Sequence, residues 1–160
     1  MTTPEEPTSG RRIVVGVDGS ETSRHALRWA ADEAAAHDAE LHVIYAWDVP
    51  APGAGIGIST GTLTAAAPEA EHDAAQQLVA QVVDEELGQS RPPRTRQSIG
   101  RGSAASVLLE AAKGAHLLVV GSRGLGGFAG LLLGSVSMKM ASHAACPVVI
   151  VRPAATQDQG

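Results

Sequence analysis

The stretch that decides the fold runs from Leu117 to Val136 and reads LLVVGSRGLGGFAGLLLGSV. Its first four residues are apolar, as in a strand that is buried on both faces. Gly121 and Gly124 follow this strand, and Gly134 and Ser135 open a segment with helical spacing. A strand, a glycine-rich loop and a helix start in this order present free backbone N–H groups to an anion, most often a phosphate. The stretch therefore predicts an α/β fold with a phosphate site.

The residue types in this loop suit phosphate chemistry. Glycine lets the backbone approach a phosphate closely and permits positive φ, which is the role expected for Gly121 and Gly124. Gly134 and Ser135 would donate N–H groups from the helix start, and Arg123 would add a charge-assisted contact. A purely structural interpretation stays open, in which the glycines shape a turn, Ser135 caps the helix and Arg123 faces solvent.

Outward from this stretch, predicted strands and helices alternate. The strands are expected at 13–18, 41–47, 94–99, 116–121 and 148–152, and the helices at 20–37, 68–88, 103–114 and 135–145. Such alternation implies right-handed crossovers and a single-domain, open, Rossmann-like parallel sheet with helices on both faces. Residues 1–10 and 154–160 are expected to be a disordered leader and a disordered tail around one domain.

Two loops of this fold are expected to meet at one pocket. Ligands of open parallel sheets lie beyond the carboxyl ends of the strands, where the strand order reverses. The loops after the first and fourth strands, which carry Asp18 and residues 121–134, would be neighbours there. Asp18 would accept a hydrogen bond from a ribose hydroxyl or hold a metal ion. The alternative is that it is an ordinary turn acid before Gly19. Residues 48–66 show no helical or strand period and are interpreted as a loop that closes over the pocket.

Composition excludes several classes of partner and site. A net charge of −5 and an aromatic content of 2% argue against nucleic acid and anionic membranes as partners. We see no apolar run of transmembrane length and no secretory signal, so a soluble cytoplasmic protein is expected. The single cysteine, Cys146, and six histidines without ligand spacing predict no metal site built from cysteine and histidine side chains.

The spacing Gly121-x2-Gly124-x9-Gly134-Ser135 resembles the nucleotide signature of the universal stress protein family, in its ATP-binding branch. Other landmarks agree in order: residues 15–20 (VGVDGS), 41–43 (LHV) and 146–152 (CPVVIVR) resemble the first, second and closing strands of that family. The resemblance covers residues 11–153.

The resemblance implies a five-stranded sheet of order 3-2-1-4-5 and ATP as the ligand, with or without Mg²⁺. The family pattern places the ATP phosphates on Gly121, Arg123, Gly124, Gly134, Ser135 and Val136. It places the adenine and ribose near Gly16, Val17, Asp18 and Val43. Since Val43 is a core strand residue, only its backbone would reach the base.

The function expected from these features is a nucleotide-dependent sensor or switch in the stress response. The sequence has no P-loop lysine and no evident catalytic base, so slow or no hydrolysis is expected. In the implied strand order, Val148–Val151 is an apolar edge, which predicts a homodimer through that strand. The open alternatives are a slow ATPase or nucleotidyl hydrolase, a cyclic-AMP-binding protein and a nucleotide-independent interaction module.

Overall fold

The computed structural model describes residues 10–47, 68–125, 130 and 132–153. The predicted leader up to residue 9, the predicted loop at 48–66 and the predicted tail at 154–160 lie outside the described residues.

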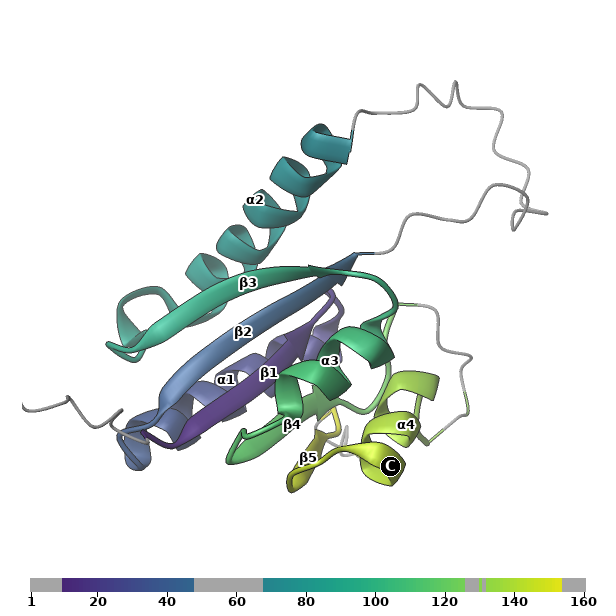
Figure 1. Cartoon of the computed structure of the whole chain (residues 1–160). Helices are drawn as coiled ribbons and strands as arrows, with labels where there is room; N and C mark the ends of the chain where they lie inside the picture. The colour runs from purple at the N-terminus through teal and green to yellow at the C-terminus, as the bar shows by residue number, and fades with distance from the viewer. Residues whose placement is uncertain (1–9, 48–67, 126–129, 131, 154–160) are drawn as a thin grey trace, which may run out of the picture.

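Five strands and four α-helices alternate along the described residues (Figure 1). Their bounds are β1 (Arg12–Val17), α1 (Glu21–Ala36), β2 (Glu40–Trp47), α2 (Pro68–Leu87), β3 (Thr95–Arg101), α3 (Ala104–Ala112), β4 (Leu117–Gly121), α4 (Ser135–His143) and β5 (Val148–Val151), with a short 3₁₀ turn, η1 (Gly88–Ser90), after α2. All strand pairs are parallel, in the order β3-β2-β1-β4-β5. The predicted alternation and strand order are confirmed, and element ends shift by at most two residues.

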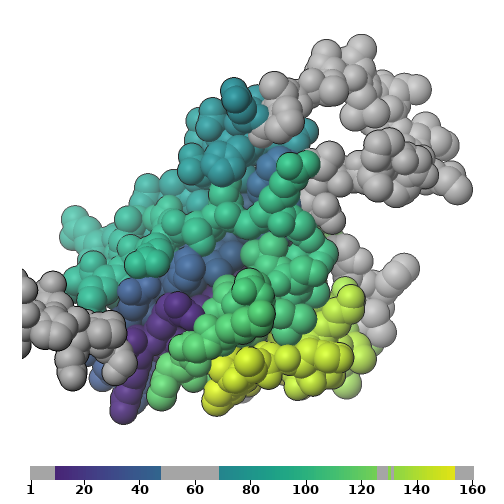
Figure 2. Space-filling model, viewed as in Figure 1, coloured from purple at the N-terminus to yellow at the C-terminus, as the bar shows by residue number. Residues whose placement is uncertain are grey.

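The helices cover the two faces of the sheet in pairs. Side chains alternate along a strand, so Val15 belongs to one core cluster with Leu27 of α1 and Val79 of α2, and Val14 belongs to another with Leu108 of α3 and Met140 of α4. In the space-filling view from the α3 and α4 side, these helices cover the β4 and β5 half of the sheet, and parts of β2 and β3 stay visible (Figure 2). The core is thus two aliphatic layers, one on each face.

Local sequence explains the central strand and its helix. Ile13, Val14 and Val15 are almost fully buried, as a β-branched run covered on both faces should be. The buried stripe of α1 includes Ala26 and Ala30, whose small side chains let the helix lie close to the sheet. The β1–β4 register pairs Val15 with Val119, so both strands end at the same edge of the sheet. The loops after β1 and β4 are therefore neighbours.

None of the described helices has both the length and the apolar character that crossing a membrane requires.

Candidate nucleotide-binding site

A cavity of about 590 Å³ opens where the loops after β1 and β4 meet α3 and α4. Nine of the ten residues predicted to bind the nucleotide line it: Gly16, Val17, Asp18, Gly121, Arg123, Gly124, Gly134, Ser135 and Val136. Two stretches about a hundred residues apart in the sequence therefore form one cavity, as the strand topology predicts.

Val43 does not line this cavity. Its side chain is fully buried in the layer beneath α1 and α2, on the opposite face of the sheet. Because side chains alternate along β2, its neighbour Ile44 and the next residue on that face, Ala46, line the cavity instead. A contact between the backbone of Val43 and a base stays a prediction. The two neighbours could have been found by applying the strand alternation to β2.

The expectation that Gly121 and Gly124 adopt a positive φ is wrong. Neither Gly121 nor Gly124 has a positive φ. A Cβ on Gly121 would lie 2.8 Å from the carbonyl carbon of Thr22 and 2.9 Å from the backbone nitrogen of Ser23. A Cβ on Gly124 would lie 2.8 Å from a carboxylate oxygen of Asp18. Glycine is therefore needed at these positions because the β1–α1 turn (residues 18–23) lies against the loop. The sequence around residue 121 contains no sign of that contact.

Hydrogen bonds join the β1–α1 turn to the glycine loop. One carboxylate oxygen of Asp18 accepts from the backbone N–H of Ser20 at 2.9 Å, and the other accepts from that of Leu125 at 3.2 Å. The hydroxyl of Thr22 donates to the carbonyl of Arg123. Asp18 therefore acts as a turn acid and also holds the loop. Its contact with a ribose or a metal ion stays a prediction.

The start of α4 lacks a side-chain cap. Its N-cap is Gly134, so the interpretation of Ser135 as the cap is wrong. Gly134 donates its own N–H to the carbonyl of Ser122 at 2.7 Å, which closes the base of the loop. The N–H groups of the first helical turn have no acceptor inside the helix. They lie at the cavity, since Ser135 and Val136 line it.

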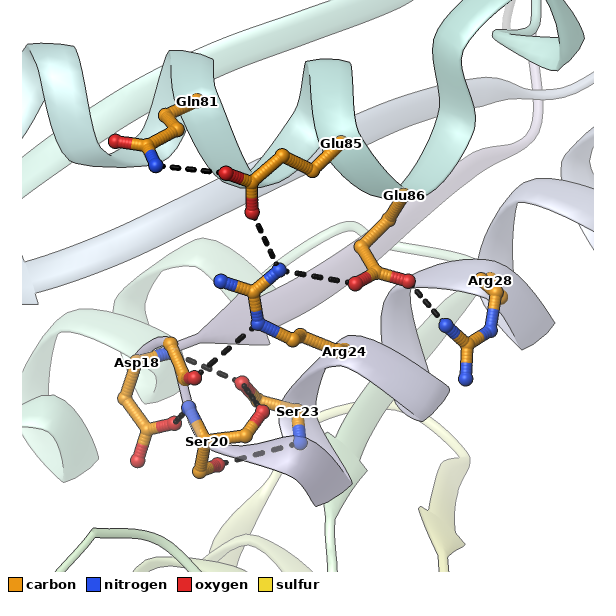
Figure 3. Close-up of polar contacts among 9 residues, drawn as sticks. Asp18, Ser20, Ser23, Arg24, Arg28, Gln81, Glu85 and Glu86 are labelled. Atoms are coloured by element: carbon orange, nitrogen blue, oxygen red, sulfur yellow. Dashed lines mark hydrogen bonds and ion pairs between the residues drawn. The ribbon is translucent and has the colours of Figure 1, made fainter.

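An ion-pair network fixes the β1–α1 turn from the other side (Figure 3). The Nε of Arg24 donates to the carbonyl of Gly19 at 3.3 Å, and its Nη1 lies 2.7 Å from Glu85 and 2.9 Å from Glu86, both on α2. Arg28 also pairs with Glu86. The hydrogen bond to Glu85 is the main cause of the raised pKa of Arg24. Sequence reasoning missed this network, because its partners are about sixty residues apart.

The cavity combines polar and apolar parts. On the β4 side, the lining includes the loop backbone and the first turn of α4. On the β2 side it is apolar, with Ile44, Ala46 and Leu108. Among the described lining residues, the charged side chains are one base, Arg123, and one acid, Asp18. This arrangement suits a ligand with an anionic group at one end and an apolar ring at the other.

Nothing among the described residues offers a protein-built metal site, since they contain no group of three or more His, Cys, Asp or Glu side chains that could hold an ion. Cys146 is half-buried, and burial raises the pKa of its thiol.

The chain belongs to the universal stress protein family, whose sequence profile matches residues 10–152. It is 37% identical over 142 residues to a universal stress protein of Mycolicibacterium smegmatis, a match that covers 87% of this chain and 47% of that protein. It is 33% identical over 144 residues to a universal stress protein of Thermus aquaticus, a match that covers 89% of this chain and 98% of that protein. The chain spans about half the length of the first curated relatives it matches.

A solved structure with the same fold is a universal stress protein in complex with cAMP. It superposes on this chain with a TM-score of 0.65 and is 28% identical, and the match covers 89% of this chain and 97% of that one.

Proposed function

We propose that this chain binds an adenine nucleotide in the cavity, with the phosphates at the glycine loop and the start of α4. The observation that carries the proposal is the uncapped start of α4 at a cavity of about 590 Å³ whose β2 side is apolar. Free N–H groups and the positive end of a helix dipole favour a phosphate. The apolar residues Ile44, Ala46 and Leu108 suit a flat base. The cAMP complex of a relative with the same fold supports this assignment.

ATP is the first candidate, because the glycine spacing resembles the ATP-binding branch of the family. Among the described lining residues, the charges of Arg123 and Asp18 cancel, so a triphosphate would need Mg²⁺ carried on its own oxygens. A cyclic phosphodiester has a single negative charge and needs no such ion, which makes cyclic AMP the second candidate. Mass spectrometry of denatured, purified protein should identify a co-purified adenine nucleotide.

Isothermal titration separates the candidates. We expect ATP to bind in the presence of Mg²⁺ and more weakly without it, whereas cyclic AMP binding would not depend on Mg²⁺. Gly134→Leu should abolish binding of either ligand, because the added side chain would stand at the start of α4. If no adenine nucleotide binds and none changes the thermal stability, the result favours the alternative of a nucleotide-independent interaction module.

We propose that the protein holds ATP as a sensor or switch and hydrolyses it slowly or not at all. Both carboxylate oxygens of Asp18 already accept backbone N–H groups, so this acid is poorly placed to activate water. The alternative is a slow ATPase or nucleotidyl hydrolase. Steady phosphate release that requires both Asp18 and Mg²⁺ would favour the enzyme over the switch. Since ATP is a cytoplasmic metabolite, the proposal also places the protein in the cytoplasm.

We further propose a homodimer through β5. This strand lies at one edge of the sheet, and its four residues are the half-buried apolar Val148–Val151. The opposite edge, β3, carries exposed Arg96 and Arg101, which discourage strand pairing. Pairing of β5 with its copy would cover the apolar edge by a two-fold contact. A single monomer species in analytical ultracentrifugation at micromolar concentration would contradict the dimer.

A further inference from the structure

Ser137 is a buried serine whose hydroxyl closes the base of the glycine loop. It lies in the first turn of α4 and is 2% exposed. Its hydroxyl lies 3.0 Å from the carbonyl oxygen of Ser122 and 2.9 Å from that of Gly134, and it donates to this pair of acceptors. Each carbonyl also accepts a backbone N–H. The N–H of Gly134 donates to the carbonyl of Ser122, and the N–H of Met138 donates to the carbonyl of Gly134. The hydroxyl therefore joins the two ends of the loop at their carbonyl groups.

The two carbonyls determine where two N–H groups point. A trans peptide unit is planar, so the N–H of the following residue points opposite to the carbonyl. The peptide unit that starts at Ser122 carries the N–H of Arg123, and the unit that starts at Gly134 carries the N–H of Ser135. Arg123 and Ser135 both line the cavity. Within the described part of the chain, neither of these N–H groups donates to a protein acceptor.

We propose that Ser137 is a positioning residue for the phosphate end of the cavity. By holding two carbonyls toward itself, its hydroxyl directs the N–H groups of Arg123 and Ser135 away from itself and keeps them open to an anion. Without the hydroxyl, the two peptide units lose the hydrogen bond that they share and that helps to fix their rotation. A carbonyl oxygen that turns toward the cavity repels a phosphate. The inference rests on the proposed function and adds a residue outside the glycine signature.

The chain offers a matched control on the same helix. Ser142 also donates its hydroxyl to a main-chain carbonyl, that of Met138 at 2.9 Å, but it is exposed and lies near the other end of α4. Ser137→Ala and Ser142→Ala therefore remove the same group and the same kind of hydrogen bond. They differ in whether that bond holds the glycine loop.

The test compares a ligand that has phosphates with one that has none. Titration calorimetry with ATP plus Mg²⁺ and with adenosine gives two dissociation constants, and the readout is their ratio. In Ser137→Ala we expect ATP to bind about five- to tenfold more weakly, the factor that corresponds to one net hydrogen bond, with adenosine unchanged. Ser142→Ala should bind both ligands like the unsubstituted protein. Ser137→Thr keeps the hydroxyl and should keep the ratio, since a packing effect of its methyl group would act on both ligands.

Three results with the Ser137 variants would overturn the inference while leaving the proposed function intact. An unchanged ratio in Ser137→Ala means that the hydroxyl does not act on the phosphate end. Equal losses for ATP and adenosine mean a general structural role. If Ser137→Thr changes the ratio as much as Ser137→Ala does, the hydroxyl is not the responsible group. If the unsubstituted protein binds no ATP at all, the proposed function fails, and this inference fails with it.

Discussion

The N-termini of α1 and α4 face the same cavity region but differ in what accepts their first backbone N–H groups. At α1, the N-cap Ser20 accepts from the N–H of Ser23, and Asp18 accepts from the N–H of Ser20. At α4, the N-cap is Gly134, which has no side chain to contribute. Helix starts need partners for their first N–H groups. In α1, a side chain therefore satisfies an N–H group of the first turn, whereas α4 has no side-chain cap, as the proposed phosphate site requires.

The third helix with a described N-cap supports this contrast. The start of α3 has Ser103, whose hydroxyl accepts from the N–H of Ser106, as Ser20 does at α1. Serine therefore caps the other two α-helices whose N-caps the structure describes, and glycine stands at the start of α4, where we propose the phosphate site. Substitutions that make α4 resemble α1, or the reverse, test whether the contrast has a functional meaning.

Of the substitutions that exchange one kind of helix start for the other, Gly134→Asp, which gives α4 a side-chain cap, is expected to have the largest effect. The nearest atoms to a Cβ at this position are 3.5 Å away, so the side chain has room. The carboxylate would accept the N–H groups that a phosphate needs and would repel it, so ATP affinity should fall about 30- to 100-fold in calorimetry. The ligand-free protein should become more stable by about 0.5–1 kcal/mol in urea denaturation.

Gly134→Asn is the control for charge in this experiment. It supplies a similar cap without the negative charge, so it should weaken ATP binding less than Gly134→Asp does. If Gly134→Asp binds ATP as tightly as the unsubstituted protein, the start of α4 is not the phosphate site.

Gly121→Ala should produce the largest loss of stability. Its Cβ would lie 2.8 Å from the carbonyl carbon of Thr22, a backbone atom that cannot move without shifting α1. We expect a loss of about 1–3 kcal/mol in the free energy of unfolding, as in other overpacked sites. Gly134→Ala is the matched control, because its Cβ meets only ordinary contacts. Equal losses in the two variants would mean that the contact between the turn and the loop is not tight.

Ser20→Ala should separate stability from binding. Loss of this cap should cost about 1 kcal/mol in the free energy of unfolding and leave ATP affinity within about twofold. Ser103→Ala removes the equivalent cap from α3 and should behave in the same way. A large loss of ATP affinity in folded Ser20→Ala, with Ser103→Ala unaffected, would show that the start of α1 also serves the ligand.

Arg24→Gln should have a smaller effect, a slight loss of stability at the turn before α1 (residues 18–23). It removes the ion pairs with Glu85 and Glu86 and the bond to the carbonyl of Gly19. Melting temperature should fall slightly, and the difference should shrink in high salt, because the pairs are partly exposed. Arg28→Gln removes a pair with Glu86 but no bond to Gly19. Hydrogen exchange of the 18–23 turn should rise in Arg24→Gln only, and equal exchange in both variants would contradict the role of Arg24.

The smallest effect concerns His42, which lies on β2 away from both helix starts. Burial lowers its pKa, with a contribution from the positive charges of Arg96 and Arg12 that exceeds the opposite effect of Glu40. The unfolded chain therefore binds a proton at higher pH than the folded protein does. The free energy of unfolding should fall as the pH drops below about 6.5, the ordinary histidine value.

His42→Gln should flatten this pH dependence without changing ATP affinity. Denaturation midpoints measured between pH 7 and pH 5 would show the change in slope. His42 Nε2 forms a hydrogen bond of 2.7 Å with the hydroxyl of Ser98. The side-chain amide of glutamine carries both a donor and an acceptor that can replace this bond. Identical slopes in the two proteins would mean that His42 titrates alike in the folded and unfolded states.

The sequence by itself determined the order of elements, the parallel sheet and most of the cavity. Apolar runs such as Ile13–Val17 and the spaced glycines are local patterns, and the chain order of strands and helices limits the topology. Nine of the ten predicted site residues line one cavity for this reason. The prediction for Val43 came from the family resemblance and concerned its backbone, whereas alternation along β2 places the side chains of Ile44 and Ala46 at the cavity.

Only the tertiary structure decided why particular residues are needed. Gly121 lies against the backbone of Thr22, and Ser137 holds two carbonyls, one of them fifteen residues away. Arg24 joins a turn of the site to α2. These contacts join residues that are far apart in the sequence, and periodicity and spacing carry no information about which distant atoms meet. The sequence thus predicts where a nucleotide would lie, and the packing of α1, α2 and α4 decides how its loop is held open.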